Sequence, residues 1–329
     1  MEQMVGRTWI IIVNYRTADL VIDCLRSIAT QIGDLPGLHA VVVDNASGDG
    51  STEKLLQAIN HEGWQDWASV ISSRRNGGFA YGNNIGIREA LRSADHVDHV
   101  MLLNPDTIAH TGAIRALVEF MAGHPQAGIA GSLLENAEGG IEPSAHHAPS
   151  PLGELVSTAR LGMLSRTLAR HVATPPMRET AHECDWVSGA SLIIRREVFE
   201  QIGLMDEGYF LYFEEVDFCT RARNAGWQVW FVPESRIVHL EGASTGIRDT
   251  RRRRAAYWYD SRRRYFIKHF GIAGLALADA LWALGRSSFA LRRMLRLGSG
   301  GGQQDPKWFA FDLLWGDFQS LFSRSNHGK

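Results

Sequence analysis

Short apolar runs and helix-type periodicities alternate along the first 125 residues of the chain. Apolar runs rich in β-branched residues predict strands, and apolar residues spaced three and four apart predict helices. Strands are predicted at residues 8–13, 40–43, 68–72 and 99–103, and helices at 17–32, 51–59, 82–93 and 111–122. Ser51 or Thr52 is the expected N-cap of the second helix. This alternation indicates βαβ units and a parallel sheet covered by helices.

The pattern is less regular after residue 125. Within the weaker stretch 138–176, residues 139–151, GGIEPSAHHAPSP, are rich in turn formers and predict a flexible loop, and residues 152–171 are expected to form a mobile helical segment. A strand is then predicted at 186–195, helices at 196–202 and 214–225, and a strand at 228–232.

Polar side chains follow the predicted strands at their carboxyl ends. Sheets of this kind bind ligands at that edge. The residues concerned are Asn14 and Tyr15 after the first strand, Asp44 and Asn45 after the second, and Asn104 and Asp106 after the fourth.

The tripeptide Asn104-Pro105-Asp106 comes directly after a strand. A carboxylate at this place suits a hard divalent cation that also contacts a diphosphate. The alternative is an Asx turn in which Asp106 caps a helix.

An acidic run, Glu214, Glu215 and Asp217, begins a predicted helix within the aromatic stretch YFLYFEEVDF. The helix dipole favours carboxylates there, and their mutual repulsion raises a pKa toward a value useful for a general base. The alternative is a solvated acidic helix start, which the aromatic surroundings make less fitting.

Two further segments are candidates for ligand contact. His239 follows the 228–232 strand by a few residues and is a candidate metal ligand or phosphate contact, or else a structural or surface histidine. Residues 74–87, RRNGGFAYGNNIGI, lead into a helix with glycines that allow close approach of a ligand and Asn side chains that donate and accept hydrogen bonds. They suit a nucleotide or phosphate, although they match neither the Walker A nor the GxGxxG pattern.

Composition describes an ordinary folded protein. The 329 residues are 45% hydrophobic and 21% charged with a net charge of −2, which fits about two domains and excludes disordered, collagen-like and coiled-coil chains. Three separated cysteines, Cys24, Cys184 and Cys219, argue against disulfides or structural zinc and fit a reducing compartment. The N-terminal residues predict a first strand, not a signal peptide, and no apolar run is long enough to predict a transmembrane helix.

The C-terminal part is basic. Residues 248–296 carry 13 Lys and Arg against three Asp, a net charge of +10. Residues 270–284 are apolar apart from Asp279 and suit a helix in a membrane interface. The arginines at 251–254 and 262–264 are candidates for binding nucleic acid, anionic lipid or the pyrophosphate of a lipid-linked acceptor, or form a solvated basic helix. A Gly298–Gly302 linker and an aromatic segment at 308–322, a candidate oligomer interface, follow.

Taken together, these motifs resemble the inverting glycosyltransferase family 2. The resemblance rests on IIIVNYRTADLVIDCLRSI, VVVDNASGDGS, NGGFAYGNNIGI, LLNPDT, the long segment from WVSGASLIIRR to CTRARNAGW, and VHLEGAS, over residues 8–245. It implies an α/β GT-A fold, a Rossmann-like, mostly parallel sheet flanked by helices, in residues 1–245. Residues 246–329 would be a helical C-terminal extension, with a possible membrane or oligomer contact.

The resemblance also implies roles for individual residues. The donor, a nucleotide-diphosphate sugar, would be bound by Val13, Asn14, Tyr15, Asp44, Asn45, Asn76, Gly78, Phe79, Asn83, Asn104 and Asp106. Mg²⁺ or Mn²⁺ would be held by Asp106 and His239, and the acceptor by Trp186, Ser188, Gly189 and Glu214. Glu215 would be the catalytic base, with Glu214 and Asp217 orienting it or the acceptor. The chain departs from the family pattern at Asn104, where many members have Asp, and at Glu215, where Asp is common.

Among members of the family, the sequence is most similar to bacterial rhamnosyltransferases, a likeness to which YDSRRRYFIKHFG adds. The expected reaction is metal-dependent transfer of L-rhamnose from dTDP-rhamnose, with a UDP-sugar as another donor, to a saccharide or lipid-linked saccharide for cell-surface polysaccharide. The expected location is cytoplasmic, with peripheral contact to an anionic inner membrane face and homo-oligomerisation as options. A non-catalytic nucleotide-sugar or glycan-binding protein is the alternative. No nucleic-acid partner is expected, because the basic stretch lies outside the matching core.

Overall fold

The computed structural model describes residues 6–240, 252–295 and 305–323, in two compact units. The first unit comprises Met1–His146, Pro176–Phe210 and Glu214–Ser244, and the second comprises His147–Pro175, Leu211–Phe213 and Thr245–Lys329. The expected division of the chain after residue 245 stays a prediction, because residues 241–251 lie outside the described residues, and two inner segments also join the second unit. Arg251 and the expected Gly298–Gly302 linker lie outside the described residues.

Strands and helices alternate through the first half of the chain, as expected. The strands are β1 Thr8–Asn14, β2 His39–Asp44, β3 Ala68–Ser72, β4 His99–Leu103, β5 Thr107–Ala109, β6 Ala127–Glu135, β7 Ile141–Glu142, β8 Ala145–His146, β9 His182–Glu183, β10 Trp186–Val187, β11 Ser191–Arg195 and β12 Gln228–His239. The helices are α1 Ala18–Ala29, α2 Ser51–Glu62, α3 Phe79–Arg92, α4 Ala113–Gly123, α5 Pro151–Ala159, α6 Gly162–Thr167, α7 Arg196–Ile202, α8 Glu214–Asn224, α9 Ala256–Met294 and α10 Phe309–Ser323, with 3-10 turns η1 Ile32–Asp34 and η2 Ala169–His171.

The first unit is built on one mixed sheet in the order β3-β2-β1-β4-β11-β6-β12-β5. Strands β1 to β4 pair in parallel, β11 runs antiparallel between β4 and β6, and β12 is parallel to β6. This mostly parallel sheet with helices on its faces is the α/β arrangement that the alternation predicts.

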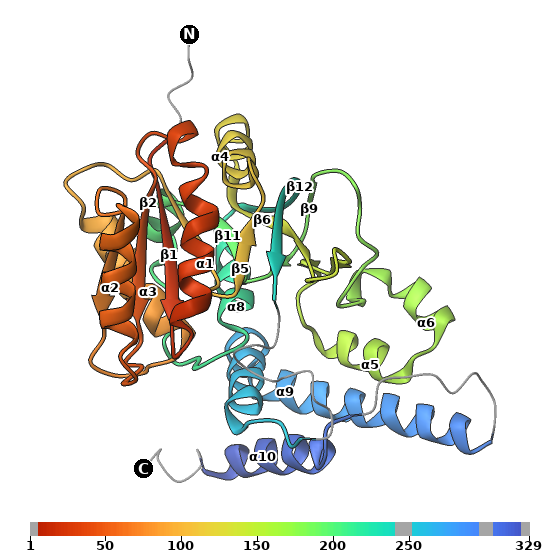
Figure 1. Cartoon of the computed structure of the whole chain (residues 1–329). Helices are drawn as coiled ribbons and strands as arrows, with labels where there is room; N and C mark the ends of the chain where they lie inside the picture. The colour runs from red at the N-terminus through yellow and green to blue at the C-terminus, as the bar shows by residue number, and fades with distance from the viewer. Residues whose placement is uncertain (1–5, 241–251, 296–304, 324–329) are drawn as a thin grey trace. The chain divides into compact units, whose positions relative to one another are not determined.

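Alternate side chains of the buried strands point to opposite faces of the sheet and form two cores. On one face Ile10 and Ile12 pack with residues of α1, α2 and α4. On the other face Ile11 packs with residues of α3, α7 and α8. Figure 1 shows α1, α2 and α3 around β1 and β2. Strands buried on both faces read as continuous apolar runs, which explains why β1 and β2 are evident from the sequence.

Several elements differ from the sequence prediction. Helix α3 begins at Phe79 instead of residue 82, and Gly50 is the N-cap of α2, not Ser51 or Thr52. The predicted 186–195 strand is two strands separated by residues 188–190, and the buried strand β6 was not predicted. The 152–171 segment forms α5, α6 and η2.

The second unit is helical, and a buried arginine ties its helices together. Arg262, on α9, is only 2% exposed. Its guanidinium donates to Glu154 Oε1 of α5 at 3.1 Å, to Asp279 Oδ1 of α9 at 3.0 Å and to Asp317 Oδ2 of α10 at 3.0 Å. A buried cation needs such partners, because desolvation without them is costly.

Helix α9 is much longer than the apolar run from which a helix was expected. It spans 39 residues and is interrupted at Gly271, whose φ of 71° and ψ of −179° are not helical. By length and composition alone, α9 is the one described helix long and apolar enough to cross a membrane. Whether the chain spans a membrane stays a prediction, because this test concerns length and composition only.

Candidate functional site

A hydrogen-bonded cluster joins the carboxyl ends of β1 and β2. Asn14 is fully buried and donates from Nδ2 to Asp44 Oδ1 at 2.8 Å. The same Asp44 oxygen accepts from Ser47, and Asp44 Oδ2 accepts from Thr52 Oγ1 at 2.6 Å. Both oxygens of Asp44 therefore have protein partners, and a ligand would share the lone pairs that remain.

The glycine-rich loop before α3 lies against this cluster. Asn45 Nδ2 donates to Asn76 Oδ1 at 3.1 Å and to Gly78 O at 3.0 Å. Asn45 Oδ1 is buried and has no hydrogen-bond partner among the described residues. Gly78 has a φ of +89°, and a Cβ there would collide with the carbonyl of Phe210, which accepts from Phe79 N at 2.8 Å. Only glycine fits this position, for both reasons.

Three other expected donor residues are placed around the loop. A Cβ on Gly82 would lie 2.7 Å from Val13 Cγ1, so α3 packs tightly on β1. Asn83 is buried and donates to Phe79 O at 3.0 Å, while Tyr15 is exposed beneath the guanidinium of Arg16. Tyr15 is thus the most accessible of these side chains.

The Asn104-Pro105-Asp106 segment meets the end of β12. His239 Nε2 lies 3.4 Å from Asp106 Oδ1 and 3.3 Å from Asn104 Nδ2. Asp106 and His239 are both buried, and Asn104 Oδ1 is a buried acceptor without a hydrogen-bond partner among the described residues. Residues 135 positions apart thus bring a carboxylate, an imidazole and an amide group to one place.

The 188–190 turn connects this triad to the acidic helix. The carbonyl of Ala190 accepts from the Asn104 backbone N–H at 2.9 Å. A Cβ on Gly189, the preceding residue, would lie 3.6 Å from both Glu215 Cβ and Phe79 Cε1. Asn104, Glu215 and Phe79 therefore flank a single short turn, and the side-chain-free Gly189 leaves space beside Glu215.

Glu215, the expected catalytic base, lies at the start of α8. Its side chain is partly buried, and Oε2 has no hydrogen-bond partner among the described residues. Burial raises the pKa of Glu215 to about 7, although backbone N–H groups of Glu215 and Val216 oppose the shift. A carboxylate that titrates near neutral pH accepts a proton more readily than an ordinary one. Its neighbour Glu214 is almost fully buried.

Asp217 has a structural environment instead. It is fully buried and accepts from Arg221 Nε at 2.9 Å. Arg221 also donates to the carbonyls of Ile202 and Leu204 at 2.8 Å each. These contacts attach α8 to the end of α7 and the loop that follows, and they occupy Asp217 away from Glu215.

Two residues expected at the acceptor site belong to β10 or follow it: Trp186 is the first residue of this strand, and Ser188 comes directly after it. Trp186 stacks on His146 of the paired strand β8, with ring centroids 4.2 Å apart. Ser188 donates its backbone N–H to Ser144 O at 3.0 Å.

The sequence reasoning did not identify Ser47, Thr52, Phe210 and Ala190, which hold the site residues in place. Ser47 and Thr52 follow Asp44 within the polar stretch DNASGDGST, a signal that points to side-chain partners for Asp44. The roles of Phe210 and Ala190 depend on their backbone carbonyls, so residue type gives no signal for them.

Comparison with known proteins identifies the family. Residues 6–258 match the model of the family described as "Glycosyltransferase like family 2". The chain belongs to this family. It is therefore a glycosyltransferase, the class of enzyme that the motifs predict, and the GT-A fold expected for residues 1–245 is confirmed by solved members of that fold.

Relatives within family 2 include rhamnosyltransferases. The chain is 30% identical over 273 residues, 80% of its length and 84% of the relative's, to N-acetylglucosaminyl-diphospho-decaprenol L-rhamnosyltransferase of Mycobacterium tuberculosis. It is 32% identical over 222 residues, 68% of its length and 63% of the relative's, to the low-salt glycan biosynthesis hexosyltransferase Agl10 of Haloferax volcanii.

A solved structure shares the fold. The mannosyltransferase PcManGT from Pyrobaculum calidifontis, in complex with GDP-Man and Mn²⁺, aligns with a TM-score of 0.55 and 14% identity over 98% of this chain and 81% of that one. At this identity the likeness concerns the fold alone.

Proposed function

We propose that this glycosyltransferase moves L-rhamnose from dTDP-L-rhamnose to a hydroxyl group of a lipid-linked saccharide, with inversion at the sugar C1 and with a divalent cation. The main support is the 188–190 turn, whose Ala190 is hydrogen-bonded to Asn104 and whose Gly189 adjoins Glu215. The proposal requires the diphosphate end and the base to lie about a sugar's width apart, and their contacts with the same short turn support this. The rhamnosyltransferase relative supports the choice of sugar and of acceptor.

The donor nucleotide fits the cluster at the ends of β1 and β2. Asn14 and Asp44 are held rigidly by their hydrogen bonds, and the free buried acceptor of Asn45 suits a donor on the ligand. Tyr15 is exposed at the rim and suits stacking on the base. Gly78, Phe79 and the start of α3 suit the diphosphate, because a helix N-terminus attracts anions.

A divalent cation fits Asp106, His239 and Asn104 as a partial ligand set. Among the described residues no group of three His, Cys, Asp or Glu side chains forms a complete metal site. Mg²⁺ and Mn²⁺ accept a small number of protein ligands when substrate phosphates supply others. The 3.4 Å approach of His239 Nε2 to Asp106 Oδ1 supports this fit, as does the buried Asn104 Oδ1, which has no hydrogen-bond partner among the described residues. When bound, the cation would stabilise the negative charge of the departing diphosphate.

Glu215 is the proposed base. Its carboxylate takes the proton of the acceptor hydroxyl as the hydroxyl oxygen attacks C1, and the bond from C1 to the diphosphate oxygen breaks. Direct attack from the face opposite the diphosphate inverts C1. The space beside Gly189 suits the sugar ring, and Glu214 and Trp186 suit acceptor contacts. Asp217 is left out of proton transfer, because Arg221 occupies its carboxylate.

The second unit suits attachment to a membrane surface where a lipid-linked acceptor resides. Apolar side chains of α10 are exposed, including Phe311 and Trp315, as is Trp308 just before it, and Phe270 and Leu277 are exposed on α9. Aromatic and aliphatic residues with neighbouring arginines are typical of interfacial helices. Peripheral attachment on the cytoplasmic face follows from this proposal, and self-association through α10 is its alternative.

A thermal-shift screen followed by a transfer assay tests the function. The purified protein is heated with dTDP-rhamnose, UDP-glucose and GDP-mannose, each with Mn²⁺ or with EDTA, because a ligand of the native state raises Tm. We expect the largest Mn²⁺-dependent rise with dTDP-rhamnose, and transfer of rhamnose with inverted C1 by NMR. A larger rise and turnover with UDP-glucose would replace rhamnose as the donor, in line with the hexosyltransferase relative.

A further inference from the structure

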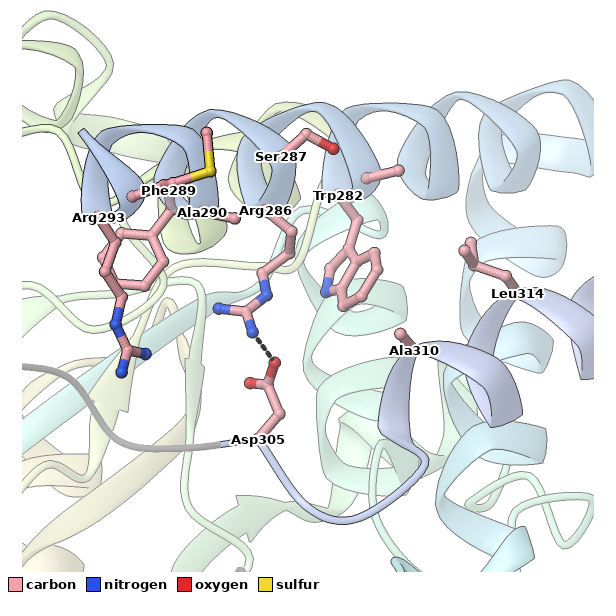
Figure 2. Close-up of a pocket in the computed structure, with 11 residues that line it drawn as sticks. Trp282, Arg286, Ser287, Phe289, Ala290, Arg293, Asp305, Ala310 and Leu314 are labelled. Carbon is pink, nitrogen blue, oxygen red and sulfur yellow. Dashed lines mark ion pairs between the residues drawn. The ribbon is translucent and has the colours of Figure 1, made fainter.

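A pocket of about 710 Å³ opens in the second unit between the C-terminal part of α9 and the start of α10. Its walls are apolar: Trp282 and Phe289 come from α9, and Leu314 comes from α10 (Figure 2). The volume is within the range of small-molecule sites, and aromatic walls of this kind are typical of them. None of these residues belongs to the donor, base or metal groups described above.

One side of the pocket is ionic. Arg286 and Arg293 line it from α9, and Asp305 lines it from the segment before α10. Arg286 forms an ion pair with Asp305, drawn as the dashed line in Figure 2. Arg293 is exposed and forms no ion pair within residues 6–240, 252–295 and 305–323. The lining therefore has one cation more than it has anions, and that cation is available to a ligand.

Exposed apolar side chains continue from the pocket along the end of α9. Leu291, Met294 and Leu295 are each more than half exposed, and Met294 also lines the pocket. Exposing such side chains to water is unfavourable, at about 25 cal/mol per Å². A ligand with a long hydrocarbon chain would cover them while its first carbons fill the pocket.

We propose that this pocket binds one long-chain isoprenoid phosphate, with the phosphate at Arg293 and Arg286 and the chain over Trp282, Phe289 and Leu314. Charge complementarity supports an anionic head, because guanidinium groups bind phosphate through paired charge-assisted hydrogen bonds. The concave apolar walls select a single chain, whereas a bilayer surface requires only exposed groups. This inference rests on the proposed lipid-linked acceptor and assigns a site to its lipid phosphate.

Calorimetric titration of the full chain with farnesyl phosphate below its micelle concentration tests the site. We expect saturable binding by the wild-type protein and none with farnesol, which lacks the phosphate, or with inorganic phosphate, which lacks the chain. Arg293→Gln should weaken binding by about ten-fold, the loss of a charge-assisted contact. The matched control is Arg170→Gln, which removes an exposed arginine of the same unit outside the pocket and should leave binding unchanged.

Two further variants separate a ligand role from a structural one. Asp305→Asn releases Arg286 from its ion pair and removes a negative charge, so farnesyl phosphate should bind more tightly. Ala290→Trp places a bulky ring in the lining and should abolish binding, whereas Ala280→Trp on the exposed part of the same helix should not. Melting curves of each variant show that its fold is intact.

Three results would overturn the proposal. They are no binding of farnesyl phosphate at about 1 mM, a loss of affinity in the control variants Arg170→Gln or Ala280→Trp equal to that in the pocket variants, and weaker binding by Asp305→Asn. Binding only to phosphatidylglycerol vesicles would assign the surface to the bilayer instead of to a single isoprenoid phosphate. Each result leaves the donor chemistry untouched. Loss of rhamnose transfer to a lipid-free saccharide, by contrast, would point to the catalytic groups of the first unit.

Discussion

The carboxylate of Asp217 accepts a hydrogen bond at 2.9 Å from Nε of Arg221, which lies one helical turn later. The side chain of Asp217 is completely buried. Three carboxylates that are indistinguishable in the sequence are thereby separated. Asp217 serves the fold, Glu214 is buried at the start of α8, and Glu215 keeps an oxygen available beside Gly189.

Removing Asp217 should therefore destabilise the protein. Breaking a buried ion pair leaves an uncompensated charge, so Asp217→Ala should lower the free energy of unfolding by about 3 kcal/mol. The exposed pair Arg115–Glu119 has the same i,i+4 spacing and provides the control. Glu119→Ala should change stability by less than about 0.5 kcal/mol, and urea unfolding measures both. Equal effects would contradict a structural role for Asp217.

Replacing the proposed base should abolish turnover without unfolding the chain. Glu215→Gln keeps the shape of the side chain and removes its ability to take a proton, so kcat should fall by about 10²–10⁴-fold. Glu53→Gln, at an exposed position of α2, is the matched control. Near-normal turnover of a folded Glu215→Gln protein would remove Glu215 from this role.

The pH profile should report the same residue. Because burial raises the pKa of Glu215 to about 7, the base is protonated below neutral pH and ionised above it. Log kcat/KM should rise with a slope of one up to about pH 7 and then level off. Measurement with dTDP-rhamnose between pH 5 and 9 checks this, and a plateau extending down to pH 5 would be inconsistent with the raised pKa.

Metal removal should affect donor binding through Asp106. EDTA should abolish transfer, and Mn²⁺ should restore it in the wild-type protein. Asp106→Asn should also lose most of the Mn²⁺-dependent rise in Tm caused by dTDP, because it replaces a carboxylate ligand by a neutral amide. Asp66→Asn, which changes an exposed aspartate, should keep the full rise. A full rise in Asp106→Asn would exclude Asp106 as a ligand.

The ion cluster of the second unit should make stability depend on pH. Asp279 faces Arg262, with Glu154, Asp317 and Arg263 also in the cluster, and burial raises the pKa of Asp279 from 3.8 to about 7. A raised pKa means that the folded state holds the proton more tightly. The contribution of Asp279 to the free energy of unfolding is therefore complete below about pH 4 and is lost as the pH rises through 7.

Asp279→Asn mimics the protonated carboxyl at every pH. The variant should therefore gain Tm relative to wild type above pH 7 and lose that advantage near pH 5, as measured by thermal melts. Asp23→Asn is the control, since Asp23 and its ion-pair partner Arg26 are both exposed and lie outside the cluster. A pH-independent difference between Asp279→Asn and wild type would refute the raised pKa.

The βαβ part of the fold could be predicted because each of its elements carries a local signal. Strand β6 has no such local signal. Its residues Gly128 and Gly131 leave space for the side chains of Trp227 and Val187, which are distant in the sequence. The predicted helix at 270–284 is shorter than α9 because Arg262 and the neighbouring arginines look like surface charges until the partners of Arg262 are known.

The same distinction applies to the site. The placement of Asn14, Asp44 and Asp106 at or just after the ends of strands could be predicted, because the strand runs are evident in the sequence, whereas their role in a site stays a prediction. The partner of Asp217 and the carbonyls of Ala190 and Phe210 depend on tertiary contacts, so their roles appear only in three dimensions.

The non-helical backbone at Gly271 makes a kink in α9. The 23 residues from there to Met294 extend for about 34 Å at 1.5 Å per residue, so a 20° change at this one joint would sweep the far tip through about 12 Å. The Arg262–Asp279 bond braces the two arms across the joint. Beyond the joint, Thr158 of α5 donates to the carbonyl of Trp282 at 3.3 Å, so the position of the arm that lines the proposed pocket depends on α5 as well as on Gly271 and the Arg262–Asp279 pair.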